Sequence, residues 1–187
     1  MGLREIIKKY EPLLKEDNYE QVFKRCTVQE KDELIDFLYN KCGINVLEHM
    51  GEIPKRFFSG LNFSNIVIPN NIISINSEAF MRSNISSVYM SDSVTEIGVG
   101  VFYGCDKLTK IRLSKSLEKI PSDTFSGCTS LQKIFIPDSV KLIGSNAFLN
   151  CADNILIVAN FRNGANKIRT PQGEVDFYKQ HMRFKRG

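Results

Sequence analysis

Histidine and cysteine are the residue types in this sequence whose side chains best suit metal binding or nucleophilic catalysis. The two histidines, His49 and His181, lie near opposite ends of the chain, and the sequence contains no Cys-X-X-Cys or His-Glu-X-X-His motif. A zinc site or a hydrolytic triad needs three or four such groups that converge on one point. The sequence therefore predicts a protein that is not an enzyme and that holds no metal and no cofactor.

The cysteines follow a regular spacing. Cys105, Cys128 and Cys151 are 23 residues apart, and in other copies of the same pattern this position holds Leu61 or Ser83. A leucine at the same position indicates a buried structural site rather than a metal ligand or a disulfide framework. We expect all five cysteines to be free thiols, namely Cys26, Cys42, Cys105, Cys128 and Cys151.

A glycine-rich stretch at residues 98–104, Gly-Val-Gly-Val-Phe-Tyr-Gly, has some likeness to a phosphate-binding loop. Equivalent stretches read Ile-Pro-Ser-Asp at residues 120–123 and Ile-Gly-Ser-Asn at residues 143–146. Because these copies lack most of the glycines, we interpret the stretch as part of a structural repeat and not as a phosphate site.

The composition is typical of a globular protein with a packed core. Of the 187 residues, 42% are hydrophobic and 25% are charged. No run approaches the roughly 18 apolar residues that a membrane span requires. Charged residues also interrupt the N-terminus, where a secretory signal would be apolar. We therefore expect a cytoplasmic protein without a membrane partner.

Positive charge is concentrated at the C-terminal end. Residues 159–187 contain seven Lys or Arg and two Asp or Glu, whereas residues 1–158 contain 18 and 19. A basic segment with interspersed aromatic residues can bind anions, including the phosphates of single-stranded nucleic acid. The alternative is a segment that caps the end of the core while its basic side chains stay in solvent. The candidate anion-binding residues are Lys179, Arg183, Lys185 and Arg186.

Phenylalanine marks a repeat of 22 or 23 residues. The repeat occurs five times, and an isoleucine stands five residues before each phenylalanine. One unit has too few apolar side chains to enclose a core, whereas stacked copies bury one another. We therefore expect a single column of phenylalanines along a solenoid, formed by Phe58, Phe80, Phe102, Phe125 and Phe148.

Each unit also contains a short segment in which every second residue is apolar, such as 66–68 (Ile-Val-Ile) and 134–136 (Ile-Phe-Ile). This alternation predicts a strand with one buried face. In the fifth unit, residues 155–158 (Ile-Leu-Ile-Val) are compatible with either register. Stacking the units predicts an α/β solenoid in which the strands form a parallel sheet.

Two stretches carry a family resemblance. Residues 136–151 read Ile-Pro-Asp-Ser-Val-Lys-Leu-Ile-Gly-Ser-Asn-Ala-Phe-Leu-Asn-Cys, and residues 126–137 read Ser-Gly-Cys-Thr-Ser-Leu-Gln-Lys-Ile-Phe-Ile-Pro. Over about residues 50–158 the sequence closely resembles the BspA-like, Treponema-type leucine-rich repeats. The resemblance implies a leucine-rich-repeat solenoid of about five repeats and a role as an interaction scaffold. Small phage and bacterial members of the family further suggest a host-directed inhibitor.

The N-terminal region, residues 1–49, is predicted to form a helical cap over the first repeat. The sequence from Thr27 to Glu30 is a capping-box pattern that starts a helix, whereas Pro12 should break or kink the helix before it. A DNA-binding helix-turn-helix at residues 19–26 and 28–42 is a weaker alternative, because its second helix is rich in acidic residues that repel phosphate. The expected organisation is thus a cap at 1–49, repeats at 50–158 and a basic cap or tail at 159–187.

The alternation within the strands also predicts which side chains point outward. We expect two neighbouring exposed rows on the sheet. One row contains tyrosine, arginine and phenylalanine, the residue types that are enriched at binding hot spots. The favoured function is a non-catalytic protein–protein interaction module with a partner of acidic character; a nucleic-acid-associated protein is the alternative. A copy of the chain could also pair with a free sheet edge. The predicted partner-binding residues are Val67, Tyr89, Lys110, Arg112, Lys133 and Phe135.

Overall fold

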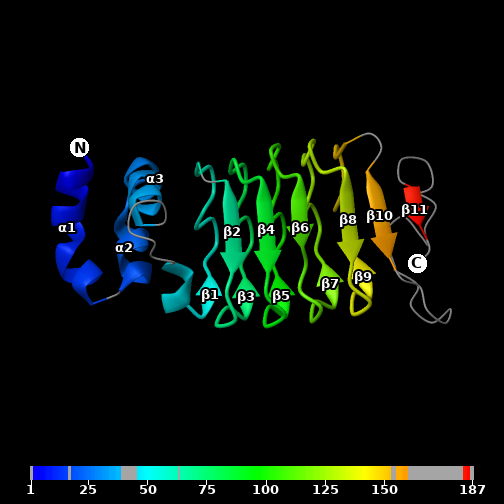
Figure 1. The fold of residues 1–187 in the computed structure, drawn as a ribbon, viewed down its shortest axis with the longest axis horizontal. Coiled ribbons are helices and arrows are strands. Elements are labelled where there is room, and N and C mark those ends of the chain that lie inside the picture. Colours follow the sequence, from blue (N-terminus) through cyan, green and yellow to red (C-terminus); the bar gives the residue numbers. More distant parts are fainter. Residues whose placement is uncertain are drawn as a thin grey trace.

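The computed structural model describes residues 2–16, 18–38, 46–62, 64–152, 155–159 and 183–185. The molecule is elongated, with helices at the N-terminal end and stacked strands along the rest of its length (Figure 1). The helices are α1 (Leu3–Lys15), α2 (Tyr19–Arg25), α3 (Val28–Asp36) and a short 3-10 helix (Val46–His49).

Each repeat contributes one longer and one shorter strand, and all pairings are parallel (Figure 1). The long strands run side by side along the molecule, and the final strand, β11 (Arg183–Lys185), pairs with the last of them. The long strands are β2 (Asn65–Ile68), β4 (Ser87–Met90), β6 (Lys110–Arg112), β8 (Lys133–Ile136) and β10 (Leu156–Ala159). The short strands are β1 (Glu52–Ile53), β3 (Ser74–Ile75), β5 (Glu96–Ile97), β7 (Lys119–Ile120) and β9 (Leu142–Ile143).

The repeated phenylalanines form the predicted column. Successive ring centroids are 5.0, 5.3, 5.5 and 5.4 Å apart, and successive ring planes are within 14° of parallel. The backbone N–H of each of the first four phenylalanines also donates to a carbonyl of the next unit at 2.7–2.9 Å. The fold is therefore the predicted α/β leucine-rich-repeat solenoid with helices at its N-terminal end. The column consists of Phe58, Phe80, Phe102, Phe125 and Phe148.

The parallel sheet is interrupted between the third and fourth units, where the sequence predicts continuity. Within residues 64–152, the long strands split between β6 and β8 and the short strands between β5 and β7. Pro121 accounts for the gap in the short strands. At equivalent positions the N–H groups of Asn76, Gly98 and Gly144 donate to the preceding unit at 2.7–2.8 Å. Proline has no N–H to donate to the Ile97 carbonyl.

Gly98 is a tight contact point between two units, and we predict that Gly98→Ala destabilises the protein. An added Cβ would lie 2.6 Å from the Cα of Ser77, and backbone atoms cannot swing away as a flexible side chain can. Overpacking of this kind costs about 1–3 kcal/mol, measurable by urea unfolding. Gly51→Ala is the matched control because an added Cβ there meets nothing within 4 Å. Equal stability of the two variants would contradict the tight packing.

The N-terminal helices pack onto the first repeat through aromatic rings. Phe23 of α2 meets Phe57 edge to face, with the centroids 5.1 Å apart, and Phe57 meets Phe58 in the same way at 4.7 Å. Tyr10 attaches helix α1 to α2 and α3, because its hydroxyl lies 3.0 Å from the Arg25 carbonyl and 3.3 Å from the Glu30 carboxylate, either of which can accept its proton. Phe57 and Phe23 thus connect the phenylalanine column to the helices.

Helix α1 is not broken at Pro12, which the sequence predicts to break or kink it. Helix α1 runs from Leu3 to Lys15 with Pro12 inside it. Pro12 leaves the carbonyl of Lys8 without its helical hydrogen bond. Both residues are exposed to solvent, so water can satisfy that carbonyl and the helix tolerates the proline.

The predicted capping box at the start of α3 is confirmed, and it includes an additional ion pair. The Thr27 hydroxyl accepts from the Glu30 N–H at 3.2 Å, and the Glu30 carboxylate accepts from the Thr27 N–H at 2.9 Å. The same carboxylate, only 7% exposed, accepts from the Lys9 ammonium at 2.8 Å. These contacts, the Lys9 hydrogen bond foremost, lower the pKa of Glu30 to about 2.

The low pKa of Glu30 predicts a pH-dependent contribution to stability. Because its pKa is lower in the folded than in the unfolded protein, the contribution is complete above about pH 5 and is lost as the pH falls towards 2. Glu30→Gln should therefore lower the melting temperature at pH 7, and the difference from wild type should shrink as the pH falls from 5 to 2. Glu16→Gln, at an exposed position, is the control. A difference that stays constant with pH would contradict the assignment.

Candidate interaction surface

The outer face consists of the outward-pointing side chains of the long strands. The strand register aligns these side chains in two rows within β2, β4 and β6 and again within β8 and β10, because equivalent residues of paired strands lie side by side. The same repeat positions continue both rows from β6 to β8, which are not paired. The first row is Val67, Tyr89, Arg112, Phe135 and Val158, and the second row is Asn65, Ser87, Lys110, Lys133 and Leu156.

The predicted orientation of the strands is confirmed. The alternate residues all point inward and are at most 9% exposed, whereas Val67 and Phe135 are each 58% exposed and Tyr89 is 49% exposed. Lys110 and Lys133 are also exposed. The inward-pointing residues are Ile66, Ile68, Val88, Met90, Ile111, Leu113, Ile134 and Ile136.

Arg112 differs from the prediction of a fully exposed row, because it is half-buried by contacts within the protein. Its guanidinium lies 4.6 Å from the centroid of the Tyr89 ring. It also donates to the Met90 carbonyl and to the Asp92 carboxylate, the latter at 2.9 Å. The Lys115 backbone N–H, and secondarily Arg112, hold the pKa of Asp92 below its usual range. Arg112 is therefore neutralised by an acid that stays ionised.

The two lysines of the second row have no such acid. The Lys133 ammonium lies 4.6 Å from the centroid of the Phe135 ring. Among the residues that the structure describes, no carboxylate lies within 4.0 Å of the ammonium of Lys110 or Lys133. The outer face therefore combines exposed apolar side chains with two uncompensated positive charges.

The first three long strands form a shallow hollow of about 330 Å³ on the outer face. Tyr89 and Arg112 border it together with Lys110 of the second row. An open hollow of this shape suits a protein surface better than an enclosed small molecule. The complete lining is Asn65, Ile66, Val67, Ser87, Val88, Tyr89, Lys110, Ile111 and Arg112.

The fifth unit adopts one of the two registers that the sequence left open. Ile157 aligns with Ile134 and is buried, whereas Val158 aligns with Phe135 and is half-buried. The outer face thus extends to β10, although its most exposed apolar side chains lie on β2, β4 and β8.

The repeated cysteines are hydrogen-bond donors, and Cys105 and Cys128 are buried whereas Cys151 is partly buried. Cys105 donates its thiol to the Phe80 carbonyl at 2.9 Å, and Cys128 and Cys151 make the equivalent bond one and two units further along. Burial raises the pKa of Cys105 to about 11 and that of Cys151 to about 12, and it raises the pKa of Cys128 further. Protonated thiols are poor nucleophiles and poor metal ligands. Across the described ranges, no three His, Cys, Asp or Glu residues are grouped to hold a metal.

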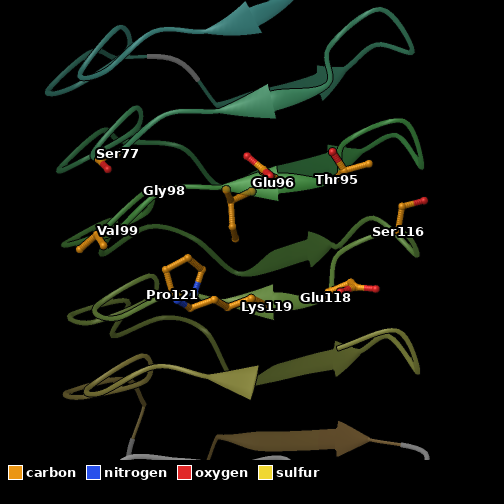
Figure 2. Close-up of a pocket in the computed structure, with 10 residues that line it drawn as sticks. Ser77, Thr95, Glu96, Gly98, Val99, Ser116, Glu118, Lys119 and Pro121 are labelled. Atoms are coloured by element: carbon orange, nitrogen blue, oxygen red, sulfur yellow. The ribbon is translucent and has the colours of Figure 1, made fainter. Parts of the chain in front are cut away.

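A larger cleft of about 660 Å³ lies on the opposite side, where the short strands are interrupted. Figure 2 shows Thr95 and Glu96 on one rim and Glu118, Lys119 and Pro121 on the other. Glu118 is already paired with Lys141 at 2.7 Å, and the rims carry charges of both signs. The cleft was not predicted, although a proline at the position of a ladder donor is the signal that could have indicated it.

The cleft is too narrow for an added strand. The third and fourth units remain in contact through the Phe102 and Phe125 rings, 5.5 Å apart, which is little more than the spacing of neighbouring strands. An inserted peptide would need about twice that separation. The exposed apolar residues and uncompensated charges of the outer face therefore make it the better candidate for a binding surface.

The predicted anion-binding residues at the C-terminal end are only partly described. Lys179 and Arg186 lie outside the described residues, and Arg183 and Lys185 are the terminal residues of β11. The backbone of β11 pairs with β10, so the edge of β10, where the sequence left pairing with a second copy possible, is occupied. No helix in the described part of the chain is long and apolar enough to cross a bilayer.

Comparison with known proteins identifies similar chains. A family model for the BspA type leucine rich repeat region matches residues 46–171 in six copies, one more than the five phenylalanine-marked units. A leucine-rich repeat protein from Bacteroides ovatus is 23% identical, with a TM-score of 0.54 over 68% of this chain and 44% of that chain. A leucine rich cell surface protein from Faecalibacterium prausnitzii is 25% identical, with a TM-score of 0.49 over 68% and 33%.

A third similar structure is the leucine rich repeat protein of T. pallidum, which is 24% identical and has a TM-score of 0.40 over 57% of this chain and 67% of that chain. No curated protein matches the chain. The chain thus spans less than half the length of the F. prausnitzii and B. ovatus proteins.

Proposed function

This chain belongs to the BspA-type leucine-rich repeat family, and from that premise we propose that its outer face binds a protein partner of acidic character. Leucine-rich repeat proteins are generally non-catalytic modules for protein–protein interaction, and stacked repeats offer an extended surface for this purpose. The proposal for this chain is a binding role without catalysis.

The observation that carries the proposal is the exposure of large apolar side chains along the first row. Val67, Tyr89 and Phe135 are each about half exposed or more, although burial of such apolar side chains would lower the free energy of the protein. Aromatic residues on a rigid sheet bind partners with little loss of conformational entropy. Aligned exposed apolar side chains on a soluble protein mark interaction sites.

The acidic character of the partner is inferred from the charges beside this row. Lys110 and Lys133 lack acidic neighbours, and Arg112 stays positioned over Tyr89. Electrostatic complementarity favours a partner whose surface carries carboxylates. The hollow on this face is shallow, so in size and chemistry it suits a protein surface.

The proposal predicts that a triple variant, Val67→Ala, Tyr89→Ala and Phe135→Ala, loses its partner. We expect affinity capture from the native host to retain one protein on wild type and at least tenfold less on the variant, because removing hot-spot side chains costs about 2 kcal/mol or more. The melting temperature should change little, because these side chains are exposed.

The control variant removes a similar apolar surface elsewhere. Ile73, Val99 and Leu149 are 52, 49 and 38% exposed and lie off the outer face. Their replacement by alanine should leave capture unchanged. Equal retention by wild type and the outer-face variant, or equal loss in both variants, would refute the proposal.

Other sequence-based predictions remain predictions. No observation on the described residues favours the nucleic-acid alternative or a host-directed inhibitory role. Cytoplasmic location is likewise still a prediction, and the similar protein of F. prausnitzii is described as a cell surface protein.

A further inference from the structure

We propose that Lys110 and Lys133 act as a clamp that binds one Asp or Glu carboxylate of the partner. This inference rests on the proposed function, because it concerns the same outer face, and it specifies the group that the partner supplies. The two lysines occupy the same position in successive units, on the neighbouring strands β6 and β8.

The free protein carries two like charges at the same position of two stacked units, whose Phe102 and Phe125 rings lie 5.5 Å apart. Like charges on neighbouring strands repel each other, and no acid of the described chain offsets this pair. The long strands also lack ladder pairing at this one step, between β6 and β8. A carboxylate bound between the two ammonium groups would relieve their repulsion, so the site is electrostatically prepared for an anion.

The remaining side chains of the outer face do not compete for this role. Arg112 already holds Asp92 at 2.9 Å. Asn65 and Ser87, the equivalents of the two lysines in earlier units, are uncharged, and Ser87 donates its hydroxyl to the Asn65 side chain at 2.5 Å. The unpaired charge of the second row is therefore confined to two adjacent positions.

These features favour a polypeptide carboxylate over the phosphates of a nucleic acid. Non-specific nucleic-acid binding draws on about six to ten phosphate contacts, whereas the clamp offers two cations. Single-stranded nucleic acids also stack bases on aromatic rings. Arg112 already lies over the Tyr89 ring and Lys133 over the Phe135 ring, so fewer ring faces remain for a base to stack on.

The clamp can be tested with fluorescein-labelled deca-glutamate, by fluorescence anisotropy at low ionic strength. We expect Lys110→Gln with Lys133→Gln to weaken binding roughly tenfold, and each single substitution to cause most of that loss, because both lysines hold one carboxylate. Lys55→Gln with Lys119→Gln removes the same charge from exposed positions off the outer face. This control should change the affinity less than twofold.

Each of four results would overturn the clamp: no binding of deca-glutamate by wild type, no loss in the clamp variant, equal loss in the control variant, or tighter binding of labelled deca-thymidylate than of deca-glutamate. The proposed function is judged separately by the alanine triple variant and host capture. If that variant loses the partner while the clamp variant keeps deca-glutamate, the clamp alone fails. If the triple variant keeps the partner while the clamp variant loses deca-glutamate, the proposed function alone fails.

Discussion

Replacing Phe102 by alanine is expected to lower the free energy of unfolding by about 3–5 kcal/mol. Phe102 is fully buried, and its ring stacks on Phe80 at 5.3 Å and on Phe125 at 5.5 Å. The substitution therefore leaves a cavity and removes ring contacts with the units on both sides. In a solenoid, stability depends on contacts between neighbouring units, so a loss in the middle weakens the coupling of both halves.

Phe135→Ala is the matched control for this prediction, because it makes the same chemical change at a side chain that is 58% exposed. We expect its effect to be within about 0.5 kcal/mol of wild type. Urea unfolding followed by circular dichroism measures both variants. If Phe102→Ala proved no more destabilising than Phe135→Ala, the phenylalanine column would not be the core of this fold.

The second large effect is expected at the junction between the helices and the repeats. Phe23 is 1% exposed, and its ring meets Phe57 edge to face at 5.1 Å. Phe23→Ala should cost about 3–5 kcal/mol and should loosen the helices from the first repeat. The newly exposed apolar end should then promote association, because a solenoid needs a cover at its termini.

Two measurements check the junction. Urea unfolding should show the loss of stability, and light scattering should show association of Phe23→Ala under conditions in which wild type and Tyr103→Ala do not associate. Tyr103 is an exposed aromatic residue of the array and serves as the control. Wild-type stability and an unchanged mass for Phe23→Ala would show that the helices do not cap the array.

The sequence predicts the fold and the outer face well because the repeat occurs five times, so that five residues indicate the environment of each repeat position. The phenylalanine spacing fixes the column, and the alternation in the strands fixes which residues point inward. Where only one unit is informative, as in residues 155–158, two registers remained open, and pairing with β8 selects between them.

The cleft could not be predicted in this way, because it depends on whether one residue can donate a backbone hydrogen bond to the preceding unit. Pro54 and Pro121 occupy the same repeat position, but Pro54 lies in the first unit, where no preceding strand needs its N–H. Pro121 follows three units and leaves the Ile97 carbonyl without a ladder donor. The half-burial of Arg112 is similar, because it depends on Asp92 in the preceding turn and on Tyr89 in the adjacent strand.

The two sides of the molecule differ in the surroundings of their exposed apolar residues. The outer face has aromatic side chains beside unpaired lysines, whereas the side formed by the short strands has isolated apolar residues beside charges of both signs. This difference is the reason for assigning the binding role to the outer face.

The most direct test is site-specific photocrosslinking in the native host. A benzophenone amino acid would replace either Tyr89 on the outer face or Val99 on the opposite side, two positions that are both 49% exposed. We expect a crosslink to one host protein from position 89 and none to that protein from position 99. Crosslinking of the same partner only from position 99, or equally from both positions, would contradict this expectation.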